Sequence, residues 1–232
     1  MEIKDNHRQW LLDSVRYFRA MEFFSQDAGL SDDALVERIV AEEQFAFWEL
    51  PEVESLWEHT SSSGDAELDE YFERLARPRR DQRDFCLTLR DTQRIWFEDG
   101  EDDIRPGDNR YIRTLQEWSD ISRGAFLPTG IREVWHQPER WPDCQVVIHF
   151  FLNGQECILE PWSGYGWLDF GLLNGINPLI ADSGYSYAEW DTGVDQRTCL
   201  VVLTGTEKHR LTAERGWEFS DVVSRGYGFR EL

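Results

Sequence analysis

The sequence is poor in positive charge, and lysine is especially scarce. Lysine occurs only at Lys4 and Lys208, and lysine and arginine together number 24 against 45 aspartates and glutamates. The formal net charge of −21 repels the phosphates of nucleic acids and the anionic surfaces of membranes. We therefore expect no direct nucleic-acid partner and no membrane partner. The preference for arginine over lysine is typical of a GC-rich coding genome, so we expect a bacterial source.

Long apolar runs and paired cysteines are also missing. No stretch approaches the roughly 20 apolar residues that cross a bilayer, and no apolar signal region follows the first residues. The four cysteines share no CxxC spacing and stand mostly in apolar runs, as buried reduced thiols do; they are Cys86, Cys144, Cys157 and Cys199. These absences favour a cytoplasmic protein in a reducing compartment.

The motifs that carry catalysis or hold cofactors are absent as well. Ser163-Gly164 lacks the Gly-x-Ser-x-Gly frame of a nucleophile elbow, and there is no glycine-rich phosphate loop. The five histidines have no ligand spacing. The acidic turn at 98–108 lacks the glycine and the terminal glutamate of a calcium-binding loop. We expect no cofactor and no metal ion, and the sequence favours a non-enzyme over an enzyme.

The first third of the chain has apolar residues at helical spacing. This spacing predicts an amphipathic helix at 6–26 capped by Asn6, a second from Ser31 or Asp32 to about residue 49, a short third after Pro51, and a fourth at about 66–77. From residue 85 the pattern changes to alternation, which predicts strands through Phe85, Leu87 and Leu89 and through Ile95 and Phe97.

The strongest local signal is Asn153-Gly154, which suits the two positive φ angles of a type I′ hairpin turn. A two-residue loop sets His149 opposite Ile158 and Phe150 opposite Cys157. One face of this hairpin is then almost wholly apolar and should meet the core. The other face is mixed; it contains Val147, His149, Phe151, Glu156, Ile158 and Glu160.

Further helices and strands follow from capping and turn signals. Thr114 and Glu117 have the spacing of a capping box for a helix that stops at Gly124, and Thr204 and Glu207 have the same spacing for a helix to about residue 215. Strands are predicted at 131–136, 185–190 and 198–203. A helix is predicted at about 168–182, and Pro178 should kink or split it.

Antiparallel hairpins with few strand–helix–strand units indicate an α+β fold, with a helical N-terminal part followed by a mainly antiparallel sheet and interspersed helices. We divide the chain into an acidic helical region at 1–84 and an α+β region at 85–232, packed together as one compact unit because no long linker separates them. The eleven tryptophans, fourteen phenylalanines and seven tyrosines are expected to fill its core.

The negative charge is concentrated in one segment. Residues 27–73 contain fifteen acids and a single base, Arg38. Such a field attracts basic proteins and speeds their association, although acids can also serve only to keep a surface solvated. Our first hypothesis is a binding protein, namely an inhibitor or immunity protein that neutralises a basic partner such as a bacterial toxin. The expected partner-binding residues are Glu42, Glu43, Glu49, Glu52, Glu54, Asp69 and Glu70, with Trp48 and Trp57 as apolar anchors.

The alternative hypothesis is an enzyme of unknown reaction. Across the predicted hairpin, Glu156 and Glu160 are diagonal neighbours of His149, near enough to orient its imidazole for acid–base work. A purely structural cross-strand pair would show the same pattern. Cys144 does not complete a thiol-protease site with His149, because residues five apart on a strand face opposite sides.

Overall fold

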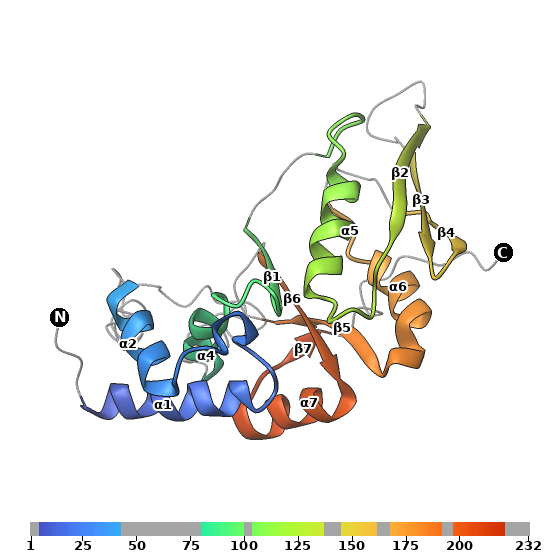
Figure 1. The fold of residues 1–232 in the computed structure, drawn as a ribbon. Helices are drawn as coiled ribbons and strands as arrows, with labels where there is room; N and C mark the ends of the chain where they lie inside the picture. Colours follow the sequence, from blue (N-terminus) through green and yellow to red (C-terminus); the bar gives the residue numbers. More distant parts are fainter. Residues whose placement is uncertain are drawn as a thin grey trace, which may run out of the picture.

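The computed structural model describes residues 5–42, 80–99, 104–136, 145–161, 168–191 and 197–220. It confirms an α+β fold in which a helical first part precedes antiparallel sheets with helices between their strands (Figure 1). The helices are α1 (Asp5–Arg19), α2 (Asp32–Glu42), α4 (Arg80–Thr88), α5 (Arg110–Ile121), α6 (Leu172–Ile180) and α7 (Gly205–Arg210). The strands are β1 (Ile95–Asp99), β2 (Thr129–His136), β3 (Gln145–Leu152), β4 (Gln155–Leu159), β5 (Tyr185–Trp190), β6 (Arg197–Thr204) and β7 (Phe219–Ser220).

A four-stranded antiparallel sheet, in the order β1-β6-β5-β7, divides the interior into two hydrophobic cores. Successive side chains of a strand point to opposite faces, and on β6 they enter the two cores alternately. Cys199, Val201 and Leu203 lie in the first core, whereas Leu200 and Val202 lie in the second. Burial on both faces explains why this segment of the sequence is continuously apolar instead of alternating.

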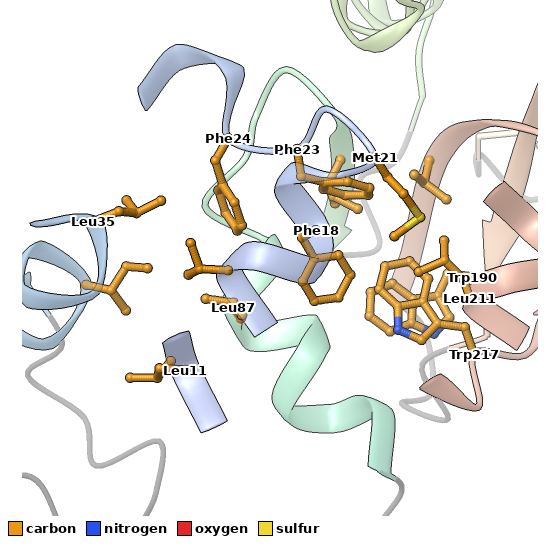
Figure 2. Close-up of a cluster of buried hydrophobic side chains, with 14 of the residues drawn as sticks. Leu11, Phe18, Met21, Phe23, Phe24, Leu35, Leu87, Trp190, Leu211 and Trp217 are labelled. Atoms are coloured by element: carbon orange, nitrogen blue, oxygen red, sulfur yellow. The ribbon is translucent and has the colours of Figure 1, made fainter. Parts of the chain in front are cut away.

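The first core lies between this sheet and the helices α1, α2 and α4 (Figure 2). Its densest part is a pair of buried indoles: the rings of Trp190 and Trp217 stack with centroids 3.5 Å apart and an interplanar angle of 9°. Phe18 of α1 packs against Trp217 at 5.9 Å. Leu87 of α4 belongs to the same cluster, and the boundary expected between residues 84 and 85 falls inside α4.

The second core lies on the opposite face of the central sheet. It is enclosed by α5, α6 and a three-stranded antiparallel sheet in the order β2-β3-β4, which we call the outer sheet (Figure 1). Trp118 of α5 and Phe150 of β3 are completely buried here. Large aromatic side chains among the described residues therefore fill both cores, as expected from the sequence.

The hairpin between β3 and β4 has the predicted register. Asn153 and Gly154 have φ angles of +53° and +80°, and Phe150 lies opposite Cys157. The apolar face is buried, with β3 side chains alternating between core and surface. The Asn-Gly turn and the apolar face together fix this pairing, because a register slip of one residue would turn the apolar side chains towards solvent.

The first predicted helix is wrong at its end, since α1 stops at Arg19 rather than continuing to residue 26, and Asn6 lies inside α1 rather than capping it. The chain then turns through Phe24, whose φ is +58°. Two distant side chains hold this turn: Arg94 donates to the Met21 carbonyl at 2.5 Å, and Asp91 accepts from the Phe24 amide at 2.5 Å. Both partners lie about 70 residues away, so no local pattern could reveal them.

The strand predicted through residues 85–89 is also wrong, because the chain forms α4 there. Asp84, Leu87 and Thr88 are buried, and their spacing of three and four residues is that of one face of a helix. An alternation over five residues is too short to distinguish the two periods. By contrast, β1 forms at 95–99 as predicted, and Ser31 caps α2 by accepting from the Ala34 amide at 3.1 Å.

Of the two predicted capping boxes, one forms. At the start of α7 the Thr204 hydroxyl accepts from the Glu207 amide and the Glu207 carboxylate accepts from the Thr204 amide. Thr114 and Glu117 lie instead within α5, which begins at Arg110. The Glu117 carboxylate accepts from the indole of Trp96 at 2.8 Å, so a tertiary contact uses the residue that the local motif would have used.

The remaining predictions have mixed outcomes. Strands β2, β5 and β6 match the predicted segments closely. Helix α6 passes through Pro178 without splitting and ends at Ile180, and a 3₁₀ turn at Ala181–Ser183 follows it. The helices expected after Pro51 and at 66–77 lie outside the described residues. No helix within the described ranges is both long enough and apolar enough to cross a bilayer.

Candidate functional site

The outer sheet turns one face towards the second core and the other towards solvent, and we call the latter the outer face. Cross-strand pairing arranges it in rows. The middle row is Arg132, His149 and Ile158, taken from β2, β3 and β4 in turn, and the next row contains Phe151 and Glu156. His149 and Glu156 are therefore diagonal neighbours, as the hairpin register predicted.

A carboxylate at the centre of this face joins two basic side chains. The Glu156 Oε1 lies 3.3 Å from the His149 Nδ1 and 3.3 Å from an Arg132 guanidinium nitrogen. The Glu156 side chain is 47% exposed and that of His149 is 21% exposed. Arg132 reaches across β3 to make its contact. The result is a trio of contacting polar side chains that is accessible to solvent.

Two large apolar side chains flank this trio. Phe151 is 45% exposed and Ile158 is 49% exposed, although both belong to regular strands. Within the described ranges, the other large apolar residues with such exposure are Leu127 and Leu179. An apolar pair beside a fixed charged group has the composition of a small protein interface, in which apolar anchors are combined with a few polar contacts.

The position of Phe151 depends on an irregularity in β2. The pairing of β2 with β3 shifts register between Thr129 and Arg132, and Gly130 in this bulge has a φ of +61°. A Cβ added to Gly130 would lie 3.3 Å from the Phe151 ring. The bulge and the glycine thus let the aromatic ring lie close over the backbone of β2. Bulges of this kind commonly redirect side chains near functional sites.

The trio can orient an imidazole, but the described residues supply little else for catalysis. Cys157 faces the second core, and burial raises the pKa of its thiol, which disfavours the reactive thiolate. No group of three or more histidine, cysteine, aspartate or glutamate side chains within the described ranges is arranged to hold a metal ion. Glu160 follows β4 on the surface, and His149 contacts Glu156. The geometry therefore supports recognition better than chemistry.

The acidic segment is only partly described. Glu42 is the last residue of α2, and the other expected partner-binding residues lie outside the described ranges; they are Glu43, Trp48, Glu49, Glu52, Glu54, Trp57, Asp69 and Glu70. Four acids at the start of the segment are neutralised by arginines. Arg8 contacts Asp33 and Glu37, while Arg16 and Arg19 contact Asp32, and Arg38 contacts Asp27; three of these arginines come from α1.

This pairing corrects one step in the reasoning from the sequence. Counting charges within residues 27–73 finds almost no balancing cations, yet α1 packs along α2 and supplies them from outside that window. The beginning of the segment is consequently less negative than its sequence suggests. Residues 5–42 hold eight acids and four arginines, so most of the surplus of acids over bases is carried by the rest of the chain.

A second cluster of charges is buried and serves the fold. Arg94 is 2% exposed, and its guanidinium lies 4.3 Å from the centre of the Phe23 ring. Burial, together with the nearby Arg123, lowers the pKa of Arg94 to about 10. Glu207 neutralises both arginines, and burial raises the pKa of Asp91, which faces the same cluster. Glu207 lies in α7, Arg94 directly before β1 and Arg123 shortly after α5, so this cluster joins these three parts of the fold.

Phe151 and Ile158 could have been assigned to the site from the sequence, because the hairpin register places them on the same face as His149. Arg132 could not, since the bulge in β2 changes the pairing that decides which β2 residue meets His149. The chain matches no protein-family model, and comparison with the curated proteins and with the solved structures finds no match for it.

Proposed function

We propose that this chain is a protein-binding protein whose partner is basic, and more specifically an inhibitor or immunity protein that neutralises a basic toxin. The supporting observation is the distribution of its charge. Ten described arginines are already paired with carboxylates of the same chain. Because the chain holds 45 acids and only 24 lysines and arginines, the unmatched charge that remains is negative.

A surplus of this size acts beyond direct contact. Screening in about 0.1 M salt extends over roughly 10 Å, so separate acids on the surface add to one field. Such a field raises the association rate of a basic protein at low ionic strength and excludes acidic competitors. An inhibitor that must capture its target quickly benefits from this steering.

The proposal is tested with a charge-reversal variant and a matched control. Glu49, Glu52, Glu54 and Glu70 are changed to lysine in the first variant; Asp108, Asp120, Asp182 and Glu218, all exposed, are changed to lysine in the second. Both variants have the same net charge. A partner is captured on the wild-type chain at low ionic strength, identified, purified, and titrated against all three proteins by calorimetry.

We expect the first variant to lose at least tenfold in affinity and the second to lose much less. Charges that contact the partner interact with it more strongly than distant charges, which contribute only to the overall field. Equal losses would show that only the net charge matters and that residues 49–70 form no specific surface. Unchanged affinity in both variants would refute binding through the acidic surplus. If the purified partner has a toxic activity, one equivalent of the wild-type chain should abolish that activity.

A second candidate function is acid–base catalysis by His149, which the 3.3 Å contact with Glu156 favours. A carboxylate in this position can orient the ring for proton transfer. The test is a comparison of the wild-type chain with His149→Gln over a panel of ester, amide and phosphate substrates. Turnover that is present in the wild type and lost in the variant would support the enzyme; equal background rates in both would remove it.

A further inference from the structure

We draw no further inference here: the strongest candidate, the exposed apolar pair Phe151 and Ile158 on the outer face of the β2-β3-β4 sheet, carries none, because the neighbouring Glu156 is already paired within the chain and nothing among the described residues shows what covers this pair.

Discussion

Two completely buried tryptophans differ in one respect that mutation can measure. The indole nitrogen of Trp217 donates to the buried carboxylate of Asp84 at 3.2 Å (Figure 2 shows the ring within the first core). The indole nitrogen of Trp118, in the second core, has no hydrogen-bond partner among the described residues. Replacement by phenylalanine removes the same atoms from each site, so the loss of apolar contact is similar in the two variants.

The polar contributions, however, have opposite signs. Trp217→Phe removes one hydrogen bond to the buried carboxylate of Asp84, and a hydrogen bond to a charged group contributes about 1.5–3 kcal/mol. Trp118→Phe removes a buried donor that is unsatisfied, which relieves a penalty of about the same size. We therefore expect Trp217→Phe to be less stable than Trp118→Phe by about 2 kcal/mol or more. For a chain of this length that difference is a change in melting temperature of roughly 4–8 °C.

The assay is equilibrium unfolding in urea, followed by circular dichroism, with the wild type and both variants measured at one pH. The slope of free energy against denaturant should be equal in all three, so that the midpoints can be compared directly. If Trp118→Phe proves as unstable as Trp217→Phe, or more unstable, then the polar contributions have been assigned wrongly. That result would mean that the Trp118 nitrogen is satisfied in solution.

Three other predictions concern turns, a buried ion pair and pH. Gly130→Ala should destabilise the chain more than Gly154→Ala in urea unfolding. Both residues have a positive φ, at which an added Cβ costs about 1–2 kcal/mol. Only the Cβ added at Gly130 would also meet an aromatic ring, at 3.3 Å. Glu207→Ala should cost about 3 kcal/mol in the same assay, since it removes half of the capping box of α7 and the carboxylate that the buried Arg94 shares with Arg123. Glu214→Ala, at an exposed pair, should change stability little. Burial and Glu214 raise the pKa of Tyr17 from 10.0 to about 12, so between these values the folded chain holds a proton that the unfolded chain has lost. Stability from this group is complete below pH 10 and falls as the pH rises to 12, and the advantage of the wild type over Tyr17→Phe should shrink across that range in thermal unfolding.

Each of these predictions has a result that would contradict it. Equal costs at the two glycines would mean that the Phe151 ring moves aside freely. A small effect of Glu207→Ala would show that the arginines find other partners or water. A stability difference between the wild type and Tyr17→Phe that stays constant from pH 10 to 12 would mean that the Tyr17 hydroxyl ionises as readily when folded as when unfolded.

The sequence by itself determined the features that depend on neighbours along the chain. The type I′ turn at Asn153-Gly154 follows from the positive φ that those residues tolerate, and with it the register that brings His149 close to Glu156. The capping box at Thr204 and the strand at Ile95–Asp99 are local in the same sense. The α+β class followed because hairpins and helical periods can each be recognised within a short window.

Only the tertiary structure decided the features that depend on contacts between distant residues. Helix α1 ends early because Asp91 and Arg94 bind the backbone of the following turn. Glu117 turns to Trp96 rather than capping a helix, and Arg132 joins the outer face because of a bulge. The acids at the start of α2 are neutralised by arginines of α1. Burial and ion pairing depend on distance in space, and a charge count along the sequence cannot supply that distance.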